Sequence, residues 1–309
     1  MSASLPPLRA PPDRRKTLTP ADSTAAGPEY PARVAVNVEA RAARLPQLGW
    51  VAGYGELLRT LVRRELRMRF KGSALGLFWS LIYPLAMVGV YTLVFSVLWR
   101  ATGNIPHYPL FVLSGLAVWG FFQAGIQLGT TSLVANGELI KKVWFPRELV
   151  PASAVLAQTV TIGVMLGILI PIALIVEPAN ARTVALVIPI VAALICLVLG
   201  LAWLLSVANV FFRDVEHLLA VVFLPWFFLT PVLYALDQFS AAHSHRWLIL
   251  LMRYGNPVTP YVESVRAVVL QHTVPGAPLL VYVFVVGPAF ALLGLWVMQR
   301  YEDRLAIEL

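Results

Sequence analysis

Charged residues are scarce in this sequence, and six long stretches contain almost none. Only 13% of the 309 residues are Asp, Glu, Lys or Arg, whereas 59% are hydrophobic; an ordinary soluble domain carries about 25% charged residues. The apolar residues form continuous blocks, which favour membrane-spanning helices over the alternating strands of a barrel. We therefore predict an all-α polytopic membrane protein with six transmembrane helices in a domain over residues 73–300. The predicted spans cover about 75–99, 109–134, 150–176, 183–210, 217–236 and 277–298.

Catalytic and metal-binding motifs are also absent from the sequence. No Asp, Glu, Lys or Arg falls in the core of a predicted span, although ion-coupled transporters keep ionisable residues at membrane depth. The chain has no HExxH or GxSxG motif, and no Lys follows a Gly as it does in an ATP-binding P-loop. The single cysteine, Cys196, excludes an intramolecular disulfide. We expect no catalytic residue, no metal and no cofactor bound by this chain, and therefore an energy source elsewhere.

Basic residues are distributed unevenly around the predicted spans. If both termini lie on one side of the membrane, that side holds 19 of the 24 Lys and Arg residues. Because cytoplasmic loops carry such an excess, we expect both termini in the cytoplasm, with residues 301–309 as the C-terminal segment. The net charge of +8 follows from the same bias, so we expect no nucleic-acid partner.

The region before the first predicted span divides into two parts. Residues 1–53 are rich in Pro, Ala and Arg and lack apolar periodicity, which predicts a largely disordered cytoplasmic tail. Residues 54–72 predict an amphipathic helix in the membrane interface; the alternative is a solvated extension of the first span. The apolar stripe of this helix is Leu58, Val62, Leu66 and Phe70, and its basic ridge is Arg59, Arg63 and Arg67.

Aromatic side chains gather in the first and fifth predicted spans, which Pro84, Pro225 and Pro231 interrupt. Flat aromatic rings stack on the apolar C–H faces of sugars, so such helices suit a channel through which a polymer slides. Packing of a protein core explains aromatic residues equally well. The residues concerned are Trp79, Tyr83, Tyr91, Trp226, Phe227, Phe228 and Tyr234.

The segment NGELIKKVWFPRELVP at 136–151 separates the second and third predicted spans. It predicts a short helix parallel to the membrane, ended by Pro146. The excess of positive charge on cytoplasmic loops explains its lysines. Trp144 and Phe145 on a loop that water reaches indicate contact with the interface or with another protein.

Residues 237–275 lie between the fifth and sixth predicted spans and contain two short apolar pieces, Trp247–Met252 and Pro257–Leu270. Neither is long enough to cross a bilayer. They predict short re-entrant outer helices, which are stable only when buried in protein or against a wet cavity. A surface loop with one amphipathic helix is the alternative.

Four segments, in order along the chain, resemble the membrane subunit of type-2 ABC exporters of lipid-linked polysaccharides, the O-antigen and teichoic-acid family. They are LVRRELRMRFKGSALGLFWSLIYPL (61–85), NGELIKKVWFPRELVP (136–151), NVFFRDV (209–215) and NPVTPYVESVR (256–266). With the span count, the resemblance covers about residues 54–300. It implies a homodimer in the bacterial inner membrane, paired with two copies of a P-loop ATPase that binds ATP and Mg²⁺. The implied substrate is a polyprenyl-pyrophosphate-linked glycan exported from the cytoplasm.

The resemblance also implies roles for particular residues. The first and fifth spans would line the substrate channel, and Arg67, Arg69 and Lys71 at its cytoplasmic entrance would hold the diphosphate, although attraction to anionic membrane lipids explains the same cations. The outer gate of the family corresponds to Asn256, Pro257, Tyr261, Glu263 and Arg266. The coupling helix that docks on the ATPase corresponds to Glu138, Leu139, Ile140, Lys141, Lys142, Val143, Trp144 and Phe145.

Other functions stay open on the sequence alone. A type-2 ABC exporter of drugs or simple lipids would share this architecture. A multi-span lipid–sugar transferase would need a catalytic acidic motif on a loop, whereas the loop acids here are scattered. A passive channel would need no loop for docking a partner.

Overall fold

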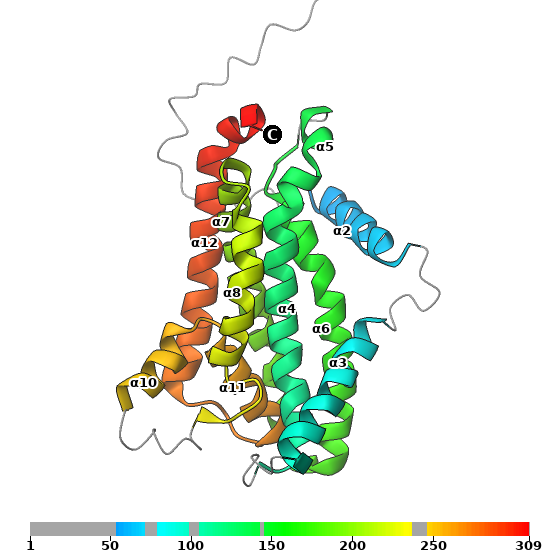
Figure 1. The fold of residues 1–309 in the computed structure, drawn as a ribbon, viewed down its shortest axis with the longest axis vertical. Coiled ribbons are helices and arrows are strands. Elements are labelled where there is room, and N and C mark those ends of the chain that lie inside the picture. The colour runs from blue at the N-terminus through cyan, green and yellow to red at the C-terminus, as the bar shows by residue number, and fades with distance from the viewer. Residues whose placement is uncertain (1–53, 72–78, 99–104, 143–144, 237–245, 309) are drawn as a thin grey trace, which may run out of the picture. The chain divides into compact units, whose positions relative to one another are not determined.

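The structure, a computed structural model, describes residues 54–71, 79–98, 105–142, 145–236 and 246–308. The chain divides into two units, Met1–Ala43 and Arg44–Leu309. The first unit and the rest of the predicted tail, residues 1–53, lie outside the described residues. Within the described residues every regular element is a helix (Figure 1), which confirms the all-α prediction.

Among the residues that the structure describes, four helices are long and apolar enough to cross a membrane by themselves. They are α4 (Tyr108–Ala135), α6 (Leu149–Val176), α7 (Val187–Phe211) and α12 (Ala277–Glu308). Two shorter apolar helices occupy the first and fifth predicted blocks. They are α3 (Trp79–Tyr91), which continues as a π-helix over Thr92–Leu98, and α8 (Val215–Leu229).

The shorter elements lie near the ends of these helices. Helix α5 (Gly137–Lys142) and the C-terminal end of α12 lie at one end of the bundle, and α10 (Arg246–Leu250) and α11 (Thr259–Leu270) lie at the other (Figure 1). A π-helical turn, Leu251–Gly255, follows α10. Two 3₁₀ turns, Pro178–Arg182 and Val184–Leu186, connect α6 to α7.

Helix α4 is the centre of the bundle. It packs against α6 and α7, and α7 packs in turn against α12. The main buried cluster includes Phe122 and Ile126 of α4 together with Leu194 and Leu197 of α7, all at most 1% exposed. Continuous apolar blocks therefore bury one face in the protein and leave the other for lipid or a partner.

Helices α7 and α12 approach each other unusually closely. A Cβ atom on Gly200 would lie 2.2 Å from the backbone of Phe290, and one on Gly294 would lie 2.3 Å from the carbonyl oxygen of Gly200. No side chain fits at such distances, so the two glycines allow the backbones to come together as small residues do between membrane helices.

Helix α8 ends at Leu229, seven residues before the predicted end of the fifth span at Leu236. The cause is Pro231: proline has no N–H, and it forces the preceding residue out of the helical region. Thr230 accordingly has an extended ψ of 132°. Helix α12, by contrast, continues to Glu308, because the sequence after Gly294 contains neither Gly nor Pro.

Helix α2 (Gly55–Phe70) precedes α3 and packs along α6. Its Leu61 is buried in a second cluster that includes Leu149 of α6, and its Arg64 donates a hydrogen bond of 2.6 Å to the side chain of Asn136 beside α5. A helix therefore occupies most of the predicted segment and packs Leu61 against the protein. Its amphipathic character and its location in the membrane interface stay predictions.

Candidate functional site

A cavity of about 690 Å³ lies between α3, α4, α6 and α8. Aromatic rings form much of its wall, and they contact one another across the helices. The rings of Tyr91 and Phe227 stack with centroids 6.2 Å apart, and the centroid of Trp119 lies 5.6 Å from that of Phe227. The aromatic side chains that line the cavity are Tyr83, Tyr91, Trp119, Phe121, Phe223 and Phe227.

Three of the predicted channel residues, Tyr83, Tyr91 and Phe227, thus come together at this cavity. Trp226, Phe228 and Tyr234 are not part of its wall: Phe228 is exposed, and the hydroxyl of Tyr234 donates to the Phe228 carbonyl at 2.8 Å. The side chain of Trp79 lies outside the described residues.

Sequence reasoning missed the contribution of α4 to the cavity. Trp119, Gln123 and Gln127 follow one another at four-residue spacing, which places them on one face of the helix. The signal was available in the sequence, because two amide side chains in a predicted membrane span need a polar environment.

Of the three predicted entrance cations, Arg69 reaches the cavity wall, where it donates a hydrogen bond to the side-chain oxygen of Gln158 in α6. Desolvation lowers the pKa of Arg69 below its ordinary value. Arg67 of α2 and Lys71, which follows the end of α2, do not line the cavity. Of these three predicted cations, Arg69 is therefore the one that contacts a membrane-spanning helix at the cavity.

The predicted coupling segment folds as the short helix α5, with Lys142 and Glu138 forming an exposed ion pair of 3.2 Å. Lys141 is exposed as well, whereas Ile140 is buried and Leu139 is partly buried. Val143 and Trp144 lie outside the described residues.

Phe145 differs from the expectation that it faces the interface or another protein. Its side chain is 7% exposed and belongs to the same buried cluster as Leu61 and Leu149. Phe145 therefore packs against the bundle, and the exposed side chains of α5 are the charged Glu138, Lys141 and Lys142.

Glu148 follows Phe145 closely and is buried at the start of α6. Its backbone carbonyl accepts a hydrogen bond of 3.0 Å from the indole N–H of Trp203, and its carboxylate accepts one of 3.5 Å from Gln299. Desolvation by burial raises the pKa of Glu148, and the nearby charge of Glu302 adds to the effect.

At the opposite end of the bundle, Asn256 connects α8 to the segment before α11. Its side-chain oxygen accepts hydrogen bonds from the indole N–H of Trp226 at 3.0 Å and from the backbone N–H of Val258 at 3.2 Å. Its amide group donates to the hydroxyl of Thr230 at 2.8 Å. Trp226 therefore has a structural partner for its polar edge.

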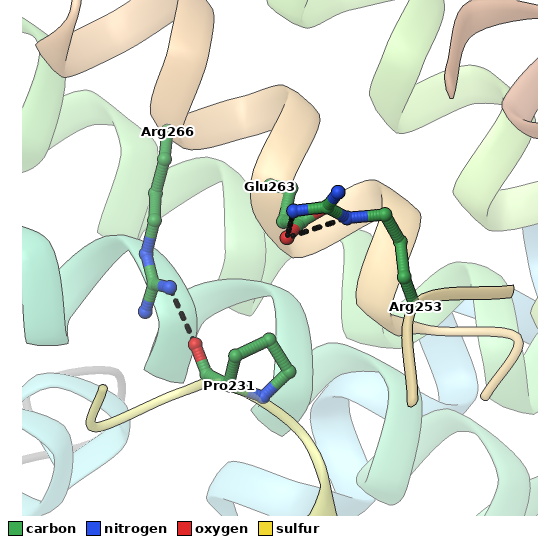
Figure 2. Close-up of polar contacts among 4 residues, drawn as sticks. All are labelled: Pro231, Arg253, Glu263 and Arg266. Atoms are coloured by element: carbon green, nitrogen blue, oxygen red, sulfur yellow. Dashed lines mark hydrogen bonds and ion pairs between the residues drawn. The ribbon is translucent and has the colours of Figure 1, made fainter. Parts of the chain in front are cut away.

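Arg266 of α11 satisfies the backbone where α8 breaks (Figure 2). Its side chain is 3% exposed and donates to the carbonyl oxygens of Pro231 and Val232, and its guanidinium lies 3.5 Å from the ring centroid of Phe111. Buried backbone carbonyls outside regular structure need a donor, and a buried cation donates strong hydrogen bonds to them.

The other predicted gate residues are also held in place. Glu263 forms a two-point ion pair with Arg253, with Nε–Oε2 and Nη2–Oε1 distances of 2.8 and 3.0 Å (Figure 2). Tyr261 is fully buried, and its hydroxyl donates to the Val283 carbonyl of α12 at 3.0 Å. Pro257 is partly buried next to Asn256. Helix α11 is thereby connected to α8, α4 and α12.

Within the described residues, no three His, Cys, Asp or Glu side chains are grouped so that they could hold a metal ion.

Known proteins resemble the chain over most of its length. It is 32% identical to the O-antigen export system permease protein RfbA of Myxococcus xanthus, over 72% of this chain and 84% of that protein. It is 27% identical to the protein of the same name from Klebsiella pneumoniae, over 81% of this chain and 94% of that protein. The polysialic acid transport protein KpsM of Escherichia coli is 22% identical, over 69% of this chain and 81% of that protein.

A protein-family model described as ABC-2 type transporter matches residues 56–270, which is more than two thirds of the chain. This confirms the resemblance that the four sequence segments indicated. The chain belongs to the ABC-2 type transporter family, as a membrane permease.

Proposed function

We propose that this chain is the membrane subunit of an exporter that moves polyprenyl-pyrophosphate-linked polysaccharide from the cytoplasm across the bacterial inner membrane. The observation that carries the proposal is the cavity among α3, α4, α6 and α8, whose wall includes six aromatic rings and three neutral amides beside aliphatic side chains. Aromatic faces contact sugar C–H groups without fixing one register, which suits a polymer in motion. The relatives named for O-antigen export and polysialic acid transport support the same substrate class.

ATP supplies the energy through a separate subunit, because permeases of this family are not enzymes and this sequence has no P-loop. The assembly is a homodimer with two copies of the ATPase. The exposed charges of Glu138, Lys141 and Lys142 on α5 support docking of that partner at this end of the bundle. ATP and Mg²⁺ bind to the partner alone.

The chain crosses the membrane six times, with both termini in the cytoplasm. Helix α8 has 15 residues, so it spans about 22 Å of a hydrocarbon core of about 30 Å. The non-helical segment that follows α8 completes the crossing of the hydrocarbon core in this proposal. Thr230 and Val232 in this segment are fully buried in protein, where irregular backbone is tolerated at membrane depth.

Transport has three steps in this proposal. Arg67, Arg69 and Lys71 hold the diphosphate of the substrate by charge-assisted hydrogen bonds, and membrane lipids compete for the same cations. Closure of the ATPase pushes on α5, which moves α3 relative to α8. The glycan advances along the aromatic wall, and α11 with Asn256, Tyr261 and Arg266 opens the outer side.

The proposal is tested in the source bacterium after deletion of the gene. Sugar analysis of the cell surface and of the cell interior is expected to show glycan retained inside, and the wild-type gene is expected to restore its export. The purified protein is expected to carry a P-loop ATPase encoded by a separate gene. Unchanged surface glycan after deletion, together with new sensitivity to drugs or altered membrane lipids, would support an exporter of drugs or lipids instead.

A further inference from the structure

The cavity wall carries a row of amide side chains that the aromatic rings do not explain. Gln123 and Gln127 continue the series that starts at Trp119, and the three residues cover about 12 Å along α4. Gln158 of α6, only 2% exposed, lines the same cavity. An amide that faces hydrocarbon is costly, so these side chains are expected where a polar ligand or water meets them.

Two hydrogen bonds fix the orientation of two of these amides. The indole N–H of Trp119 donates to the side-chain oxygen of Gln123 at 2.9 Å, and Arg69 donates to the side-chain oxygen of Gln158. The indole of Trp119 and the guanidinium of Arg69 can only donate, so they occupy the oxygens of Gln123 and Gln158. The –NH₂ groups of the two glutamines are therefore the ends that can donate to a ligand. Neither –NH₂ group has an acceptor within the described ranges, and the side-chain amide of Gln127 forms no hydrogen bond there.

Amide donors beside aromatic rings suit an uncharged, oxygen-rich ligand. Sugar hydroxyl and ring oxygens accept hydrogen bonds from N–H groups, while the C–H faces of the same sugars contact the rings. A hydrogen bond between neutral groups contributes little net free energy. A moving chain can therefore leave one amide for the next, as conduction through several weak sites requires. A diphosphate would be held more firmly by cations.

We propose that Gln123, Gln127 and Gln158 form an amide track that donates hydrogen bonds to successive sugar units of the passing glycan. The inference rests on the proposed polysaccharide function and adds to it the residues that recognise the sugar hydroxyls. The amide track favours the glycan over a lipid tail, because a lipid tail accepts no hydrogen bond and would leave the donors unsatisfied.

Gln127→Met is the sharpest test, because it keeps the length of the side chain and removes no hydrogen bond within the described structure. The melting temperature of the purified complex and its ATP hydrolysis are expected to stay unchanged. Export of glycan is expected to fall roughly two- to ten-fold, the factor that corresponds to one lost neutral hydrogen bond. Gln271→Met makes the same chemical change at an exposed position just after α11 that does not line the cavity, and is expected to export normally.

The assay is sugar analysis of surface and retained glycan in the gene-deleted source strain carrying each variant. Gln123→Met and Gln158→Met, combined with Gln127→Met, are expected to reduce export further than Gln127→Met alone. Export at the wild-type rate by Gln127→Met would overturn the amide track while leaving the proposed function intact. If the wild-type gene itself restores no surface glycan, the proposed function fails, and the amide track fails with it.

Discussion

The indole N–H of Trp226 in α8 donates a hydrogen bond of 3.0 Å to the side-chain oxygen of Asn256, which stands just before α11. Asn256 in turn donates to Thr230, the residue that follows the end of α8. The broken end of α8 and the outer helix are therefore connected through one buried amide.

Asn256→Leu is expected to destabilise the protein more than Trp226→Phe. The first change removes three hydrogen bonds and leaves buried donors unsatisfied, at a cost of roughly 1–3 kcal/mol for each, whereas the second removes one donor and keeps an aromatic ring. Thermal unfolding in detergent measures the difference. Equal melting temperatures for the two variants would contradict a connecting role for Asn256.

Arg266→Met is expected to lower the melting temperature strongly, because the carbonyls of Pro231 and Val232 would stay buried without a donor. The expected cost is roughly 3–5 kcal/mol, as for other broken buried charge networks. Arg266→Lys is expected to rescue little, since an ammonium lacks the planar fork that reaches several acceptors.

Arg253→Met is the matched control for Arg266. It removes an ion pair with Glu263 in which the side chains are 24% and 19% exposed, and the expected cost is about 1 kcal/mol. If Arg253→Met destabilised the protein as much as Arg266→Met, the special role of Arg266 at the break in α8 would be refuted.

Charge reversal on α5 is expected to uncouple ATP hydrolysis from export without unfolding the protein. Lys141→Glu changes an exposed side chain, and the exposed ion pair of Glu138 and Lys142 contributes at most about 1 kcal/mol. The ATPase activity of the complex and the glycan exported are measured together. Wild-type export by Lys141→Glu combined with Glu138→Ala would remove α5 from the coupling proposal.

Tyr83→Ala and Phe227→Leu test the aromatic wall of the cavity. Tyr83 is 67% exposed, so its loss is expected to reduce export with little change in stability. Phe227 is buried against Tyr91 and Trp119, where truncation to Ala would cost roughly 3–5 kcal/mol; Leu keeps most of the volume. Unaffected export in both variants would mean that these rings serve packing alone.

Much of the fold was predictable because charge-free blocks leave few alternatives to membrane helices. The early end of α8 was missed, although Pro231 is visible in the sequence, because a helix break at membrane depth needs a donor such as Arg266, 35 residues away. The burial of Phe145 and the bond from Trp226 to Asn256 likewise depend on tertiary packing. The family segments indicated the coupling and gate regions, while the part of α4 in the cavity required the spatial neighbours of Gln123 and Gln127.

Glu148→Gln is expected to raise the melting temperature at neutral pH. Burial raises the pKa of Glu148 above its ordinary value of 4.5, so the folded state disfavours the ionised carboxylate. In the wild type, the stability that the protonated group contributes is fully present below the ordinary value and is lost as the pH rises through the folded-state pKa. The increase in melting temperature of Glu148→Gln over the wild type is therefore expected to be largest at neutral pH and to shrink toward pH 4. An increase in melting temperature that became larger on acidification would contradict the raised pKa of Glu148.

Transport in vesicles tests the proposed function most directly. The purified subunit is reconstituted with and without its P-loop ATPase, and lipid-linked glycan extracted from the source membranes is added to one leaflet. The expected result is that glycan reaches the opposite side only when both the ATPase and ATP are present. Accumulation of glycan against a gradient by the permease alone, or ATP hydrolysis by the full complex without any movement of glycan, would contradict it.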